Sequence, residues 1–229
     1  MCGRVYVKSS VADMVRRFSF ANPGEVGALD NSFPRYNGAP TQMYPIIVVD
    51  ELAKGSTMFV AARWGFMTKT GGMIVNARSE TVATNGMFRS AYQQRRALMP
   101  IDGFFEWKDI FGTGKDKQPY AIALKSGEPF ALAAIWETWR DPKTGEDIKT
   151  FTVLTCEPNE MMATIHNRMP VMLHAADYAR WLMDPDPADL MKPFPADLMA
   201  MWRIDRKVGN AKNDTPDILD PAPPTDLFE

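Results

Sequence analysis

The sequence predicts one α+β domain, because strand-like and helix-like segments are mixed along the chain without regular β-α-β alternation. The chain has 229 residues, a length that suits one domain, and 45% of them are hydrophobic. Its 18 prolines outnumber its 15 glycines, which favours turns and irregular connections over a helical bundle. No repeat or low-complexity stretch divides the chain, so we expect a single compact unit.

The expected elements follow from local patterns. Apolar and β-branched segments predict strands over 44–49, 57–66, 73–76, 120–125, 130–139 and 150–156. The turn-rich segment 141–146 predicts a hairpin between the last two strands. Helices are expected over 11–18, 84–95 and 175–183. Ser9 or Ser10 caps the first helix, and Met87 and Tyr92 point inward from the second.

The charge is nearly balanced overall but unevenly distributed. The formal net charge is −2. The segment 61–100 nevertheless holds six basic residues against one acid, Glu80, and the chain from Asp214 onward holds five acids and no base. A basic face is compatible with a polyanion site, although scattered solvated arginines would give the same counts. We expect a folded domain over 1–213 and an acidic, flexible tail over 214–229.

Several classes of protein are disfavoured. The sequence lacks an apolar run long enough to span a membrane and does not begin with a secretory signal pattern. Its two cysteines make no disulfide framework, which fits the cytoplasm. Nucleotide-binding glycine motifs and the HExxH pattern are absent, and the two cysteines and two histidines are not spaced as zinc ligands. We therefore expect no cofactor, nucleotide or metal.

Cys2 is the first candidate reactive residue. If Met1 is removed, Cys2 carries a thiol and an α-amine on adjacent carbons, and both are partly in their reactive forms at neutral pH. The pair can capture an aldehyde, first as a Schiff base and then as a five-membered thiazolidine. It can equally attack an acyl carbon, with the amine as internal base. The position alone is also compatible with an ordinary second residue.

Three other segments can carry chemistry. Glu106 lies among aromatic residues, where burial would suit a general acid or base, but the same alternation fits a strand with Glu106 facing solvent. His166 lies in a polar loop and titrates near neutral pH, whereas His174 is interpreted as structural. Asn76 and Arg78 follow an apolar stretch and would project from one face, where they can hold a phosphate or sugar oxygen.

Taken in order, the motifs resemble the SOS response-associated peptidase (SRAP) family of abasic-site processing proteins. The matching segments are 1–4 (MCGR), 35–40 (RYNGAP), 64–66 (WGF), 76–81 (NARSET), 102–108 (DGFFEWK), 166–170 (HNRMP) and 208–213 (VGNAKN). The resemblance implies a β-barrel-like mixed core flanked by helices and a basic cleft for single-stranded DNA. It makes 1–213 the SRAP domain. Gly38 stands where a larger apolar residue is common in this family.

The resemblance also implies roles for individual residues. It makes Cys2 the covalent nucleophile, with Asn76, Glu106 and His166 completing the catalytic group. It assigns to DNA binding the residues Arg4, Asn37, Trp64, Arg78, Trp107 and Arg168. The arginines would contact phosphates and the tryptophans would lie near the bases.

The resulting hypothesis is capture of abasic sites in single-stranded DNA as a thiazolidine cross-link, with self-removal of Met1 and a possible lyase side reaction. The expected partner is abasic single-stranded DNA, bound by a monomer in the cytoplasm that associates with the nucleoid. Two alternatives use the same residues: an N-terminal-cysteine amidohydrolase, and a non-enzymatic single-strand binding module.

Overall fold

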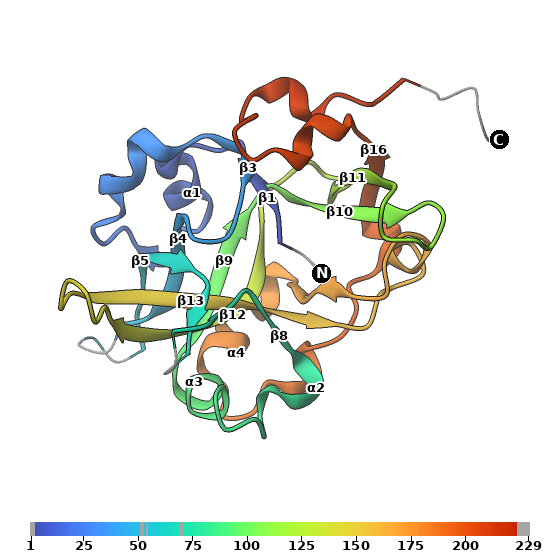
Figure 1. Cartoon of the computed structure of the whole chain (residues 1–229). Helices are drawn as coiled ribbons and strands as arrows, with labels where there is room; N and C mark the ends of the chain where they lie inside the picture. Colours follow the sequence, from blue (N-terminus) through green and yellow to red (C-terminus); the bar gives the residue numbers. More distant parts are fainter. Residues whose placement is uncertain (1–2, 51–52, 54, 69–70, 224–229) are drawn as a thin grey trace.

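A computed structural model describes residues 3–50, 53, 55–68 and 71–223. Five strands form a closed barrel: β12 pairs with β13 and β9, β9 with β4, and β4 with β5. A parallel pairing of β5 with β13 closes the ring, which makes the barrel mixed. The barrel strands are β4 (Met43–Val49), β5 (Thr57–Trp64), β9 (Arg96–Ile101), β12 (Phe130–Arg140) and β13 (Asp147–Cys156). The predicted α+β, barrel-like class is confirmed (Figure 1).

A second sheet extends from the barrel. Its order is β16-β11-β10-β1-β3. The strands are β1 (Val5–Val7), β3 (Arg35–Gly38), β10 (Gly103–Asp109), β11 (Lys117–Leu124) and β16 (Met199–Arg203). β9 of the barrel ends at Ile101 and β10 of the second sheet begins at Gly103, so one nearly continuous stretch of chain joins the two sheets. Six shorter strands complete the structure: β2 (Ala21–Asn22), β6 (Phe66–Met67), β7 (Met73–Ile74), β8 (Asn76–Arg78), β14 (Met169–Pro170) and β15 (Met172–Leu173).

Gly103 allows β1 and β10 to come close at the junction of the two sheets. A Cβ atom added at Gly103 would lie 2.4 Å from the ring of Tyr6, which occupies the space above it. The two residues are directly paired, and Val5 pairs with Phe104. Any larger side chain at 103 would therefore push β1 away from β10.

The helices are short and lie around the sheets. They are α1 (Val11–Arg17), α2 (Ser79–Val82), α3 (Arg89–Gln94) and α4 (Tyr178–Met183), with 3-10 helices η1 (Val26–Ser32), η2 (Met162–Thr164), η3 (Ala175–Asp177), η4 (Ala188–Leu190), η5 (Ala196–Leu198), η6 (Arg206–Gly209) and η7 (Pro216–Leu219). The predicted cap of the first helix is confirmed, because the Ser10 side chain accepts a hydrogen bond from the Asp13 N–H.

The prediction of a helix over 84–95 is wrong for the first half of this segment. The Asn85 side chain accepts a hydrogen bond from the Met87 N–H at 2.9 Å, which stabilises a turn, and α3 begins only at Arg89. Met87 consequently lies 43% exposed, whereas Tyr92 points inward as predicted. The strand predicted over 73–76 is divided into β7 and β8, and the predicted hairpin at 141–146 is confirmed.

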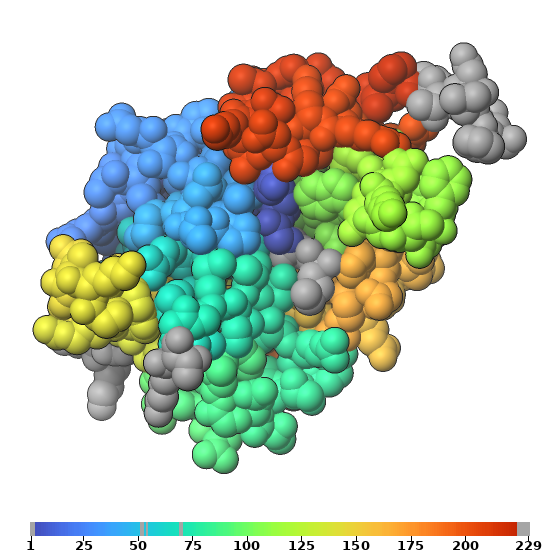
Figure 2. Space-filling model, viewed as in Figure 1, coloured from blue at the N-terminus to red at the C-terminus, as the bar shows by residue number. Residues whose placement is uncertain are grey.

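The C-terminal segment differs from the flexible tail that its acidity predicted. Over 214–223 it packs on the domain: Ile218 is fully buried, and the Trp202 indole N–H donates to the Leu219 carbonyl at 2.8 Å. Figure 2 shows the C-terminal residues, in red, lying across the blue N-terminal and green middle segments. The five acids from Asp214 onward predict exposure, but the apolar Ile218 and Leu219 among them attach the segment to the domain. Residues 224–229 lie outside the described part of the chain.

The barrel is closed over an aromatic core. Trp64 and Phe151 stack with ring centroids 6.3 Å apart, and Tyr44 meets Trp64 edge to face at 5.8 Å. All three are fully buried.

Cys156 is buried as predicted, and desolvation raises the pKa of its thiol to about 12. Within the described ranges, helices are too short or too polar to cross a membrane.

Candidate active site

Glu106 and His166 form the centre of the candidate site. Glu106 lies on β10 and its side chain is 3% exposed, so the buried alternative left open by the sequence is the correct one. Oε1 of Glu106 lies 3.2 Å from Nε2 of His166, whose side chain is 23% exposed. A buried carboxylate thus faces the ring nitrogen of a histidine that is open to solvent on one side. Such a pair can exchange a proton with a substrate.

The other ring nitrogen of His166 is held by the backbone. The Arg168 N–H donates to Nδ1 of His166 at 3.0 Å. A backbone N–H can only donate, so the neutral ring carries its proton on Nε2, which points to Glu106. The Arg168 carbonyl lies 3.2 Å from the same Nδ1 and can accept a hydrogen bond from the Nδ1–H of the charged ring. The loop therefore holds the imidazole in one orientation in both protonation states.

Asn76 and Arg78 come to this region on β8. β8 pairs with the end of β13 in parallel, with Asn76 opposite Val153 and Arg78 opposite Thr155. On β13, the same Thr155 also pairs with Pro170 of β14, directly after the His166 loop. β13 thus joins the segment that carries Asn76 to the segment that carries His166. Arg78 is exposed and Asn76 is partly buried.

Arg168 is held in an ion pair. Its guanidinium makes two parallel contacts with the Glu80 carboxylate, and Nη2 also donates to the Thr155 carbonyl at 2.6 Å. The Arg168 hydrogen bond lowers the pKa of Glu80 to about 2. Glu80 was not among the site residues predicted from the sequence. The sequence did contain a feature that could have singled out Glu80, because it is the only acid in the segment 61–100, which holds six basic residues.

Arg4 and Asn37 form a clamp at the start of β1. The Arg4 guanidinium donates to Oδ1 of Asn37 at 2.6 Å and to the Val208 carbonyl at 2.7 Å. Asn37 is fully buried, and its Nδ2 donates to the carbonyls of Val208, Asn210 and Asn213. Asp214 accepts the Asn37 backbone N–H at 2.7 Å. The clamp therefore fastens the 208–214 loop to the beginning of the first strand.

The two predicted tryptophans differ in position. Trp107 follows Glu106 on β10, is partly exposed, and has the Arg4 guanidinium 5.9 Å from its ring centroid. Trp64 is fully buried, and its indole N–H donates to the Val75 carbonyl at 3.1 Å. Trp64 thus belongs to the barrel core in this structure and presents no ring surface to solvent. Cys2 lies outside the described residues.

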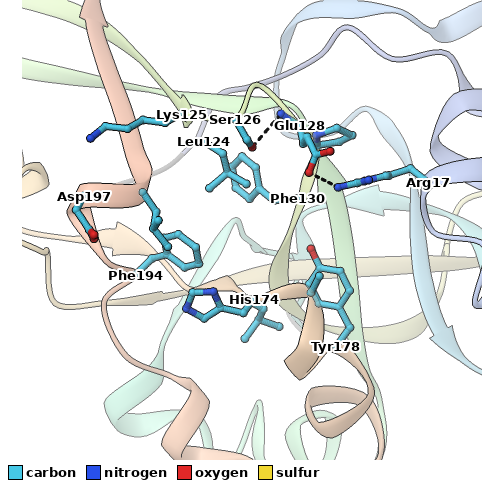
Figure 3. A pocket seen from close by; sticks show the side chains of 14 residues that line it. Arg17, Leu124, Lys125, Ser126, Glu128, Phe130, His174, Tyr178, Phe194 and Asp197 are labelled. Atoms are coloured by element: carbon cyan, nitrogen blue, oxygen red, sulfur yellow. Dashed lines mark hydrogen bonds and ion pairs between the residues drawn. The ribbon is translucent and has the colours of Figure 1, made fainter.

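A separate hollow lies around the second histidine. Its volume is about 280 Å³, and its walls include Leu124, Phe130, His174, Tyr178 and Phe194. Figure 3 shows His174 lying against Phe194, with Arg17 and Glu128 in contact at the rim. None of the predicted site residues lines this hollow.

The fold and the site define a barrel-containing α+β protein with a buried carboxylate–histidine pair. The chain belongs to the SOS response associated peptidase (SRAP) family, because the sequence model of that family matches residues 1–211. It is 34% identical to the abasic site processing protein YoqW of Bacillus subtilis, over 96% of this chain and 99% of the relative. It is 28% identical to the abasic site processing protein YedK of Escherichia coli, over 97% and 100%.

Solved structures support the fold. A protein from Bacteroides thetaiotaomicron superposes with a TM-score of 0.82 at 24% identity, covering 96% of this chain and all of that one. At this identity the likeness establishes the shared architecture and no more.

Proposed function

We propose that this protein captures abasic sites in single-stranded DNA through Cys2, after Met1 has been removed. The observation that carries the proposal is the Glu106–His166 pair, a buried carboxylate 3.2 Å from a histidine held by its loop. The relatives named abasic site processing proteins support the choice of substrate. The damaged site supplies an aldehyde in its ring-opened form, which is the group that an N-terminal cysteine captures.

The connectivity of the chain supports Cys2 as the partner of this pair. Val5 pairs with Phe104, and the Phe105 N–H donates to the Arg4 carbonyl at 2.9 Å. Gly3 precedes Arg4, so this end of the chain enters the fold alongside β10, the strand that carries Glu106. Cys2 is bonded to Gly3, and we therefore propose that its amine and thiol act next to Glu106.

The proposed reaction releases one water in total. His166 transfers a proton at the ring oxygen of the abasic sugar and so assists opening to the aldehyde. Glu106 takes a proton from the Cys2 amine, which attacks the aldehyde carbon and, on loss of water, forms a Schiff base. The Cys2 thiolate then adds to the imine carbon, the nitrogen is protonated, and a thiazolidine results. Asn76 orients the N-terminus or the sugar.

The proposed DNA contacts divide into three groups. Arg78 and Trp107 are accessible, and we assign to them a phosphate and a base face. Arg168 is shared between Glu80 and an incoming phosphate. Arg4, Asn37 and Trp64 have their polar groups engaged within the protein, so their proposed contribution to DNA binding is the shape of the surface.

Two further activities belong to the same proposal. Hydrolysis of the Met1–Cys2 bond, which consumes one water, is the peptidase reaction that exposes the amine. A Schiff base that does not close to the thiazolidine permits β-elimination of the DNA strand, a lyase reaction. Both would use the Glu106–His166 pair as the proton donor and acceptor.

The test uses an oligonucleotide with one abasic site and a matched intact oligonucleotide. Wild-type protein is expected to form a denaturation-resistant adduct with the abasic strand only. Cys2→Ala should form no stable adduct, and Cys2→Ser, which keeps the amine and lacks the thiol, should give a product that survives only after borohydride reduction. Equal adduct formation by wild type and Cys2→Ala would refute the proposal. Reversible, salt-sensitive binding without an adduct would favour the binding-module alternative.

A further inference from the structure

We infer that Glu80 is a positioning residue that holds the His166 loop in its active geometry by fixing Arg168. The inference deepens the proposed function and rests on it. Glu80 contacts the Arg168 side chain, and the Arg168 backbone contacts His166. His166 in turn contacts Glu106. Glu80 lies on α2, and the His166 loop is 86 residues further along the chain, so no local sequence constraint couples them.

The first step is the attachment of the Arg168 side chain. Both terminal nitrogens of the guanidinium contact the two oxygens of Glu80, and Nη2 also reaches the Thr155 carbonyl. A planar guanidinium bound at both nitrogens has little freedom to rotate or slide. The Arg168 side chain is only 15% exposed, whereas that of Glu80 is 44% exposed. The pair therefore anchors Arg168 to α2 and β13 together.

The second step links the Arg168 backbone to the imidazole. Its N–H and its carbonyl lie 3.0 and 3.2 Å from Nδ1 of His166, and these contacts determine which nitrogen faces Glu106. If Arg168 moves, both contacts to Nδ1 are lost together. The ring would then keep its 3.2 Å contact with Glu106 but lose the two contacts that orient Nδ1. A misplacement of about 1 Å at a reacting group can reduce a rate roughly 100-fold.

Glu80 also competes with DNA for the same guanidinium. A phosphate that binds Arg168 must share it with a carboxylate that is ionised throughout the neutral range, because the pKa of Glu80 is about 2. Removing the carboxylate frees the arginine for phosphate and relaxes the loop. Binding of undamaged DNA and formation of the adduct should therefore respond in opposite directions.

Glu157 offers a matched control. It is exposed, and its charge also raises the pKa of Arg168, but the described hydrogen bonds do not join it to that guanidinium. Glu157→Gln and Glu80→Gln remove the same charge from the same neighbourhood. Only the second removes the anchor.

The experiment compares these two variants with wild type in three measurements. The first is the single-turnover rate constant of adduct formation, which should fall about tenfold in Glu80→Gln and stay within twofold of wild type in Glu157→Gln. The second is the affinity for an undamaged single-stranded oligonucleotide, which should rise in Glu80→Gln and stay near the wild-type value in Glu157→Gln. The third is the ¹⁵N spectrum of the His166 ring without DNA, in which only Glu80→Gln should lose the Nε2–H tautomer pattern.

Equal rate constants for the two variants, with an unchanged His166 spectrum in Glu80→Gln, would overturn the inference. A parallel loss of rate and DNA affinity in Glu80→Gln would also overturn it, since that result describes a DNA-binding residue. If wild type forms no adduct, the proposed function fails. The ring spectrum still decides whether Glu80 positions His166.

Discussion

The two histidines of this chain occupy opposite kinds of environment. His166 has a buried carboxylate at one ring nitrogen and a backbone N–H and carbonyl at the other. His174 precedes η3, is exposed, and its ring packs against Phe194 with centroids 4.4 Å apart, at the hollow in Figure 3. One ring is held by directional polar contacts at both nitrogens, and the other rests on an apolar surface.

The comparison shows what converts a loop histidine into a candidate acid–base group. Both residues are histidines that lie in loops near short strands. The difference comes from residues distant in sequence: Glu106 on β10, and Glu80, which fixes the arginine beside His166. The environment of the candidate acid–base group is therefore set by contacts between segments that are distant in sequence.

The largest expected effect is a contrast between matching substitutions of the two histidines. His166→Gln should lower the rate constant of adduct formation about 100-fold or more, because it removes a general acid–base group. His174→Gln should leave the rate constant within twofold of wild type. Single-turnover kinetics with an abasic oligonucleotide measure both. A comparable loss in His174→Gln would break the distinction between the two regions.

The next effect separates stability from chemistry. Asn37→Ala removes the hydrogen bonds that the Asn37 side chain makes with Arg4 and with carbonyls of the 208–213 loop, and should reduce the free energy of unfolding by about 1–3 kcal/mol. In the His174 region, Tyr178→Phe removes the hydroxyl that accepts the Ala131 N–H at 3.0 Å, and should cost about 1 kcal/mol.

Denaturant unfolding measures both losses, and adduct kinetics distinguish the variants. Asn37→Ala should also slow adduct formation, because the clamp holds the start of β1, whereas Tyr178→Phe should not. If folded Asn37→Ala reacts at the wild-type rate, the clamp has no part in positioning the N-terminal end of the chain.

The smallest effect concerns acid stability. The folded-state pKa of Glu80 is lowered from 4.5 to about 2, so its ion pair stabilises the protein fully above pH 4.5. That contribution is lost as the pH falls from 4.5 towards 2. Because Glu80 is nearly half exposed, we expect less than about 1 kcal/mol. The stability difference between wild type and Glu80→Gln should shrink over this pH range, while that between wild type and His174→Gln should not follow it. A constant difference for Glu80→Gln would contradict the low pKa.

Much of the fold was predictable because it follows from local patterns. The strands β4, β5, β11, β12 and β13 came from β-branched and apolar runs, and α1 from its serine cap and apolar spacing. The late start of α3 within 84–95 could not be predicted in this way, because the Asn85 side chain competes with the helix for a backbone N–H. The packed segment 214–223 was missed because its acids outweighed Ile218 in the composition.

The site was predictable only in part. Glu106 and His166 could be singled out as residue types, and the structure brings them together. Sequence alone left open whether Glu106 was buried, since alternation on a strand does not say which face meets the core. The role of Trp64 in the barrel core and the Glu80–Arg168 pair depend on contacts between distant segments, which no local pattern specifies.

The most direct test of the account is the intact mass of the denatured product formed with an abasic oligonucleotide. Capture by Cys2 should give the mass of the chain lacking Met1 plus that of the oligonucleotide, less one water, as thiazolidine formation requires. Glu106→Gln prepared with the same mature N-terminus should give far less of this species in the same time. A product that still contains Met1, a mass without the loss of water, or an adduct formed equally by Cys2→Ala would contradict it.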